Sequence, residues 1–160
     1  MPDGAVQKQL HPIPEARDAP DMHLVFPASD EAVRCALASV MHVLGALEVD
    51  ALTLGAAEIV LGEVANNIVK HAYATITDGT ITLFCRKEED YVYFELSDHG
   101  SPLPGLKLPA KQDHDLSAEL NALPEGGFGW GLIRDMTHTL SYRRSGERNF
   151  LRFSIRAQDG

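Results

Sequence analysis

Apolar residues recur at helical spacing in three separate parts of the chain. The segment 54–73 has the most regular pattern, because at 3.6 residues per turn its large apolar residues fall within one arc. Similar patterns predict a helix over 30–47, capped at its start by Ser29, and another over 129–136. The arc of the middle helix consists of Leu54, Ala57, Val60, Leu61, Val64, Ile68 and Ala72.

Five further segments read as β-strands. Two of them, 80–87 and 91–98, flank an acidic turn and predict a β-hairpin, so we expect a sheet that is at least partly antiparallel. The other predicted strands are 22–26, 139–143 and 150–155.

Two stretches show no such period. Residues 1–20 hold four prolines among scattered charges, which predicts a disordered N-terminal arm ahead of a single domain at 21–160. Residues 99–126 are rich in Pro, Gly, Lys and Asp and are too long for an ordinary connection. We therefore expect a functional lid there, interrupted by a short helix near 115–123.

Composition narrows the class of protein. With 160 residues, 44% of them hydrophobic, the chain can bury one core and leaves no room for a second catalytic domain. A formal net charge of −9 argues against nucleic-acid binding, which needs clustered Lys and Arg. Cys35 and Cys85 read as core thiols, and neither a secretory signal nor an apolar run of membrane length is present. We expect a cytoplasmic protein without membrane contact.

Candidate chemistry begins on the predicted helix 54–73. Glu63, Asn67 and His71 follow the edge of its apolar arc at intervals of four residues, so they line one wall of a cleft. Asn is a poor helix former, and an ordinary amphipathic helix places solvated Lys and Glu at this margin. The helix alone supports a functional wall and an ordinary edge equally. His71 fits better as a structural histidine on the core side, and Tyr73 as a packing residue.

Two glycine-containing segments add to this picture. Asp98 ends a strand, where its carboxylate could accept a hydrogen bond from an exocyclic amine such as that of adenine, and Gly100 would let the backbone approach a flat ring. A simple Asp-X-Gly turn is the alternative. Four glycines at 126–131 precede an apolar helix, where free amides can hold phosphate. A hinge is the competing interpretation, whereas a dinucleotide-binding fold is excluded because no strand leads into these glycines.

In this order, these features resemble the GHKL family of ATPases and kinases over about residues 22 to 156. The segment 63–73 looks most like the anti-sigma-factor serine/threonine kinases of bacterial partner-switching systems. The resemblance implies the Bergerat ATP-binding fold, an α/β structure of the α+β type. It is a two-layer sandwich with a mixed, mainly antiparallel sheet covered by helices on one face.

The resemblance also implies a role for each matching residue. Glu63 would be the general base toward a partner hydroxyl, and Asn67 would be the protein ligand of Mg²⁺ bridging the phosphates of ATP. Asp98 would bind the adenine amino group beside Gly100. The phosphate-facing loop and lid hinge would be formed by Gly127, Gly129 and Gly131. Pro102 departs from the family pattern, in which many relatives keep a glycine.

The leading hypothesis is therefore an ATP- and Mg²⁺-dependent serine/threonine kinase that phosphorylates a STAS-type antagonist. In this family the antagonist competes with a sigma factor or another target, and a homodimer would form through the first strand or helix. The alternative is a non-catalytic module that binds ATP and sequesters a partner. The role of four arginines stays open between phosphate contact and a solvated face: Arg134, Arg143, Arg148 and Arg152.

Overall fold

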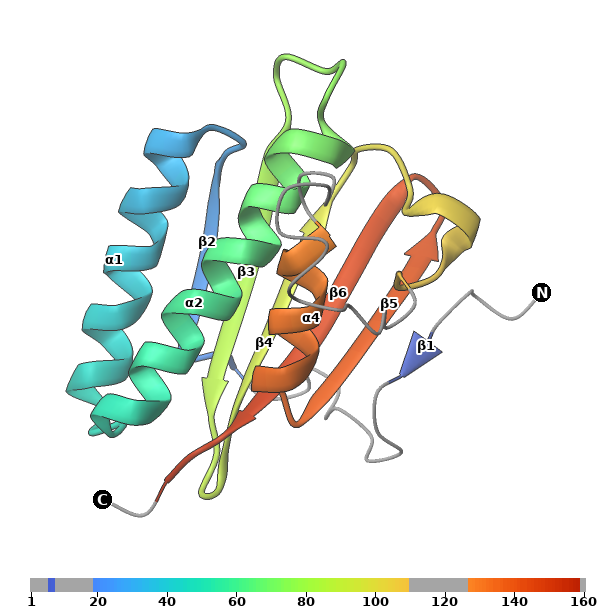
Figure 1. Ribbon diagram of the computed structural model, residues 1–160. Coiled ribbons are helices and arrows are strands. Elements are labelled where there is room, and N and C mark those ends of the chain that lie inside the picture. Colours follow the sequence, from blue (N-terminus) through green and yellow to red (C-terminus); the bar gives the residue numbers. More distant parts are fainter. Residues whose placement is uncertain (1–5, 8–18, 110–126, 159–160) are drawn as a thin grey trace.

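The computed structural model describes residues 6–7, 19–109 and 127–158 as two layers, with helices packed on one face of a β-sheet (Figure 1). The α+β class and the Bergerat-type architecture are thereby confirmed. In chain order the elements are β1 (Val6–Gln7), β2 (Met22–Pro27), α1 (Asp30–Ala46), α2 (Ala51–Asn67), the π-helix η1 (Ile68–Ala72), β3 (Thr80–Lys87), β4 (Tyr91–Asp98), the 3₁₀ turn η2 (Pro104–Leu106), α4 (Gly127–Met136), β5 (Thr139–Ser145) and β6 (Arg148–Arg156).

The sheet has six strands in the order β1-β5-β6-β4-β3-β2 across the described residues. Each pairing among these strands is antiparallel, so the described sheet contains no parallel pair. The predicted hairpin is β3 and β4, with the predicted bounds. The register places Asp98 at the end of β4 opposite Asn149 at the start of β6.

Side-chain caps fix where the first two helices begin. Ser29 accepts a hydrogen bond from the Ala32 amide at 3.2 Å, as the sequence predicts for α1. Asp50 accepts one from the Thr53 amide at 3.0 Å, so α2 starts at Ala51 rather than at Leu54. The apolar arc located the face of α2 but not this cap, because the buried residue of the first turn is the polar Thr53.

The second helix does not stay α-helical to Tyr73, as the apolar spacing predicted. After Asn67 the chain forms a π-turn, and the Tyr73 amide bonds the Ile68 carbonyl at 3.0 Å, five residues back. A π-turn holds one more residue than an α-turn, so the side chains beyond Asn67 are rotated relative to the predicted arc.

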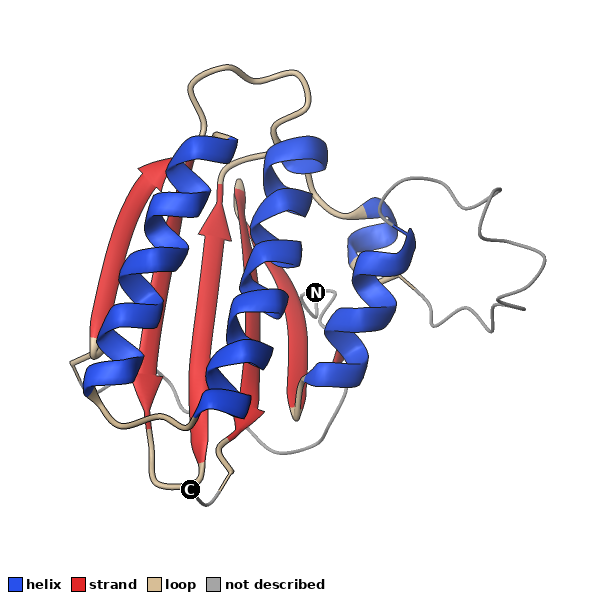
Figure 2. Cartoon of the chain, turned by 60° about the vertical axis from the view of Figure 1, so that its left-hand side comes forward, coloured by secondary structure: helices blue, strands red, loops and turns tan. Residues whose placement is uncertain are grey.

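The core lies between the helices and the sheet (Figure 2). The segment Ala51–Ala72 is long and apolar enough to span a membrane by composition, but its buried face packs in this core. The largest fully buried side chains come from both layers: Phe94, Phe153, Leu44, Leu61, Ile81, Leu83, Leu96, Ile133, Leu140, Val40, Val60 and Val64.

The two cysteines, the N-terminal arm and the predicted lid differ in how well the structure agrees with the sequence. Cys85 is buried as predicted, whereas Cys35 lies on the outer side of α1 and is exposed, so its assignment to the core was wrong. Val6–Gln7, within the predicted arm, pairs with Tyr142 and Ser141 of β5. The rest of that arm and the helix predicted near 115–123 lie outside the described residues. The described part of the predicted lid contains the 3₁₀ turn η2, an element that the sequence did not predict.

Candidate functional site

A cavity of about 320 Å³ opens beside the end of α2, a size at the lower end of small-molecule sites, about 300–1,000 Å³. Its walls come from α2, η1, the loop after β4, α4, β5 and β6, and they are mainly apolar. Polar groups enter from Asn67, His71, Asp98, Ser101, Tyr142 and Asn149. An apolar hollow with a few convergent polar groups is the usual form of a ligand site.

Asp98 lies at the sheet end of this cavity and is only 4% exposed. Its Oδ1 accepts hydrogen bonds from the Gly100 amide and from Asn149 Nδ2, both at 2.8 Å. Burial raises the pKa of this carboxyl, while those hydrogen bonds and the nearby Arg144 act in the opposite direction. The site therefore holds a desolvated acid in a defined orientation.

Gly100 is the point where the loop after β4 meets the end of the helix. The Ser101 amide donates to the Ala72 carbonyl at 2.8 Å. A Cβ built on Gly100 would collide with the carbonyl oxygen, carbonyl carbon and Cβ of Ala72. Glycine is thus required here for a close approach of two backbones.

Asn67 also lines the cavity, whereas Glu63, one turn earlier on α2, is not among the residues that line it. A Cβ built on Gly129 would lie 2.8 Å from Glu63 Oε2 and 3.7 Å from Asn67 Nδ2, so the first turn of α4 lies directly against both side chains. Asn67 Nδ2 is buried without a hydrogen-bond partner. A buried, unpaired amide calls for an explanation, and a missing polar ligand supplies one.

The donor set does not form a metal centre made of protein alone. No cluster of three or more His, Cys, Asp or Glu suited to a metal ion occurs among the described residues. Mg²⁺ typically takes one or two protein oxygens together with phosphate oxygens and waters. One amide at Asn67 beside Glu63 fits that pattern.

The two predictions made for His71 and Tyr73 had different outcomes. His71 lines the cavity and is exposed, so its placement on the core side was wrong, because the π-turn rotates it away from the arc. Tyr73 is buried, and its hydroxyl accepts from the His99 amide and donates to the Thr80 carbonyl, both at 2.7 Å. It is a packing residue, as predicted.

The glycines before the third predicted helix are part of α4 from Gly127 onward. Gly131 is exposed, with open space where a Cβ would stand, so its proposed part in the phosphate loop has no contact to support it. Of the four arginines whose role the sequence left open, Arg134 lies beside the cavity. Its Nη2 donates to the carbonyl of Pro109, a residue that lines the cavity, at 2.5 Å.

The remaining three arginines lie on the sheet face that carries no helices. Arg143 and Arg148 stand over the Phe150 ring at 4.8 and 5.4 Å from its centroid. Arg152 pairs with Glu95 at 2.5 Å. Their surroundings match a solvated sheet face better than phosphate contact.

Three site residues could not be found from the sequence. Asn149, Tyr142 and Arg144 form a hydrogen-bonded group around the Asp98 turn. Each is an isolated polar or aromatic residue near a turn between strands. No motif marks them, and only the strand register brings them to Asp98.

Comparisons with known proteins show the family of this chain. The model of the histidine kinase-like ATPase domain matches residues 26–155, so the chain belongs to the histidine kinase-like ATPase family. The chain is also similar to the serine/threonine-protein kinase BtrW of Bordetella bronchiseptica, with 33% identity over 92 residues. That alignment covers 56% of this chain and 61% of BtrW, so the match spans less than two thirds of the relative's length.

A solved structure gives the same fold. The RsbU and RsbW domains of Rv1364c from Mycobacterium tuberculosis align with a TM-score of 0.58 and 15% identity. The alignment covers 86% of this chain and 33% of that one. Membership of the family implies that this domain binds ATP.

Proposed function

We propose that this protein is an ATP- and Mg²⁺-dependent serine/threonine protein kinase of the anti-sigma-factor type. The observation that carries the proposal is that Asn67 and Asp98 line one cavity and that the first turn of α4 lies against both Glu63 and Asn67. In the proposed complex, adenine lies at Asp98 and Gly100, and the phosphates lie toward Gly127 and Gly129.

Phosphoryl transfer asks a protein chiefly for positioning, for charge stabilisation and for a group that accepts the proton of the attacking hydroxyl. In this proposal Glu63 would accept that proton. Asn67, one turn further along α2, is the side chain that would hold Mg²⁺, which would neutralise charge on the phosphates. The first turn of α4 adds backbone amides and the positive end of a helix dipole.

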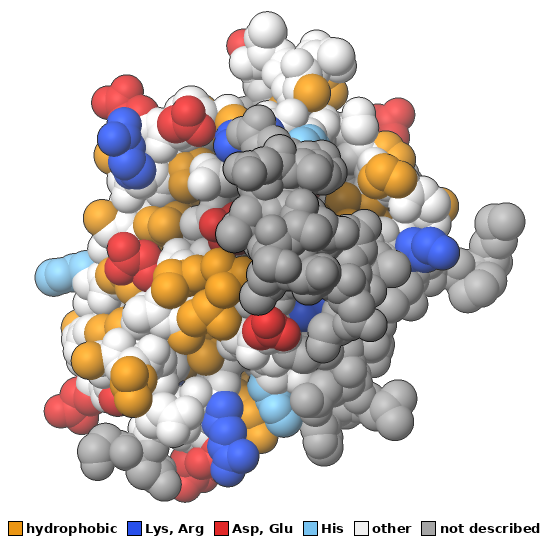
Figure 3. All heavy atoms as spheres, in the orientation of Figure 1, with side chains coloured by type: hydrophobic (Ala, Val, Ile, Leu, Met, Phe, Trp, Pro, Cys, Tyr) orange, Lys and Arg blue, Asp and Glu red, His pale blue; other side chains and the backbone are white. Residues whose placement is uncertain are grey.

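The proposed substrate is a Ser or Thr hydroxyl on a STAS-type antagonist, and the antagonist would compete with a sigma factor or another regulatory target in the cytoplasm. Hydrophobic side chains gather over α2 on the helix-covered face (Figure 3). Leu52, Ile59 and Leu132 are each at least 40% exposed on α2 and α4. Exposed apolar side chains on the helices that carry Glu63 and Gly129 suit a protein substrate better than a small molecule.

Thermal unfolding with ATP, ADP and Mg²⁺ tests the nucleotide site without knowledge of the partner. Ligand at a hundredfold excess over Kd stabilises by about 2.7 kcal/mol, which raises the midpoint by about 5–10 °C in a domain of this size. Asn67→Ala should lose the Mg²⁺-dependent part of that shift. If the native chain gives no shift at millimolar nucleotide, ATP binding and the kinase proposal both fall.

Transfer of labelled γ-phosphate to a STAS-type protein distinguishes the kinase from a non-catalytic ATP-binding module. Glu63→Gln should keep the thermal shift and lose transfer. Glu58→Gln on the exposed side of the same helix is the matched control and should keep both. Full transfer by Glu63→Gln would refute its role as the base. ATP binding without any transfer by the native chain would favour the non-catalytic binding module.

A further inference from the structure

Asn149 holds the central position in the hydrogen bonds around Asp98. It is 5% exposed and stands opposite Asp98 in the pairing of β6 with β4. Its Nδ2 lies 2.8 Å from Asp98 Oδ1, 3.0 Å from the Ser101 carbonyl and 3.3 Å from the Gly100 carbonyl. One amide group therefore ties the carboxylate to the loop that follows it.

The contacts of the carboxylate are asymmetric. Asn149 Nδ2 and the Gly100 amide both donate to Asp98 Oδ1, and among the described residues no hydrogen bond is formed by Oδ2. Because Asp98 lines the cavity, the second oxygen is the one left for a ligand. An ionised carboxylate oxygen can only accept a hydrogen bond, so this oxygen selects for a donor.

The orientation of the Asn149 amide is itself fixed. Its Oδ1 accepts from the Tyr142 hydroxyl at 2.6 Å and from Arg144 Nη1 at 3.0 Å. A flipped amide would turn its NH₂ group toward the Arg144 guanidinium, which can only donate, and its oxygen toward Asp98 Oδ1 and the Ser101 carbonyl, which can only accept, so these contacts would be lost.

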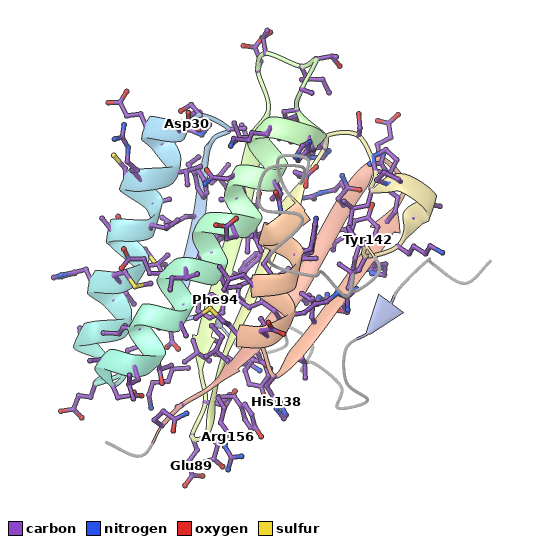
Figure 4. All side chains as sticks on the ribbon, viewed as in Figure 1. Asp30, Glu89, Phe94, His138, Tyr142 and Arg156 are labelled. Carbon is purple, nitrogen blue, oxygen red and sulfur yellow. The ribbon has the colours of Figure 1, made fainter. Side chains whose placement is uncertain are left out.

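Tyr142 and Arg144 also hold the loop. The Tyr142 hydroxyl accepts from the Leu103 amide at 3.0 Å, and Tyr142 lies on β5 close to η2 (Figure 4). Arg144 Nη1 donates to the Gly100 carbonyl at 2.7 Å. The two residues thus connect the orientation of Asn149 with the position of the loop wall.

We propose that Asn149, oriented by Tyr142 and Arg144, is a positioning residue that makes this pocket select a purine with a 6-amino group over one with a 6-oxo group. The inference rests on the proposed nucleotide site. A 6-amino group can donate to Asp98 Oδ2, whereas a 6-oxo group would place an acceptor against an acceptor. If Asn149 did not hold Oδ1, the carboxylate could rotate and lose this discrimination.

The test compares the Kd values of ATP and inosine triphosphate, measured by calorimetric titration with Mg²⁺. The two nucleotides share their phosphates, so the ratio of their Kd values reports the base alone. In Asn149→Asp the donor becomes a second carboxylate of the same size, and we expect the preference for ATP to fall by about tenfold or more. Tyr142→Phe, which keeps the ring and removes only the hydroxyl, should lower the ratio in the same direction by a smaller factor.

A matched control comes from the same two strands. Thr139 Oγ1 and Ser154 Oγ are 2.6 Å apart in a buried hydrogen bond, and neither residue lines the cavity. Ser154→Ala should lower thermal stability and leave the ratio unchanged.

Each outcome separates the two proposals. If the native chain binds neither nucleotide, the proposed function fails. If it binds both equally, the nucleotide site stands and the selectivity inference is overturned. If Asn149→Asp and Tyr142→Phe weaken both nucleotides by the same factor, Asn149 is merely structural, and the inference is also overturned.

Discussion

Gly100→Ala is the substitution for which the structure gives the clearest expected effect. The added Cβ would meet three atoms of Ala72, all of them backbone or Cβ, so no side-chain rotation relieves the contact. Overpacking of this kind costs about 1–3 kcal/mol. Separation of the two backbones also breaks the hydrogen bond from the Ser101 amide to the Ala72 carbonyl, which contributes about 1 kcal/mol.

The total expected loss is therefore about 2–4 kcal/mol, which corresponds to a fall in the unfolding midpoint of about 4–15 °C for a domain of this size. The Gly100 amide also donates to Asp98 Oδ1, so the stabilisation by ATP should shrink together with the midpoint. Thermal unfolding with and without ATP and Mg²⁺ measures both effects.

Gly55→Ala is the matched control. Gly55 lies within α2 with no atom within 4 Å of an added Cβ, so alanine there should stabilise by about 0.5–1 kcal/mol through helix propensity. A loss of about 2 kcal/mol would lower the midpoint by clearly more than about 2 °C. If the midpoint of Gly100→Ala stayed within about 1 or 2 °C of the native value, the close approach of the two backbones would be refuted.

Three further predictions follow from local chemistry. Asp50→Ala removes the cap of α2 and should cost about 1 kcal/mol, with the ATP-dependent shift preserved; a lost shift would mean that the cap also shapes the site. Cys85, whose pKa burial raises to about 12, should resist a thiol reagent at pH 8 while exposed Cys35 reacts; two fast thiols per chain would contradict this burial. Because the ionised form of Asp98 accepts the hydrogen bond and burial raises its pKa, the ratio of ATP to inosine triphosphate affinity should fall on acidification at a higher pH than an ordinary aspartate would give. A ratio that falls only at the pH at which an ordinary aspartate is protonated would count against this.

The charged and titratable groups near Asp98 affect this last profile. Arg144 and His99 lower the pKa of Asp98. Tyr73 and Tyr142 interact with the same carboxylate, and burial raises the pKa of both phenols well outside the tested range. His99→Gln, which removes the imidazole next to Asp98, tests whether the change in the ratio belongs to Asp98.

The sequence predicted elements well wherever a local pattern decides the structure. The bounds of β3 and β4 followed from composition and the acidic turn between them, and Ser29 marked the start of α1. Asp98 stands at the end of a correctly predicted strand, and Asn67 lines the same cavity from α2, although that helix ends at Asn67 and not at Tyr73. The roles assigned to these residues stay predictions.

Features set by tertiary contacts could not be predicted in this way. Asn149 meets Asp98 across 51 positions of the chain, and their meeting depends on a strand register that no local pattern contains. The π-turn likewise has no signature in apolar spacing, since it becomes visible only as the bond from Tyr73 to Ile68. His71 was misplaced for that reason.

The π-turn at Ile68–Ala72 has a consequence for how this chain tolerates changes in length. It accommodates one residue more than an α-helix would over the same turn. Deletion of a single residue here would let the helix continue regularly, and local helix stability would improve. The Ala72 carbonyl would then point elsewhere and no longer meet the Ser101 amide. Insertions and deletions within this short segment are therefore constrained by the loop that it holds, even though the helix by itself would favour the shorter chain.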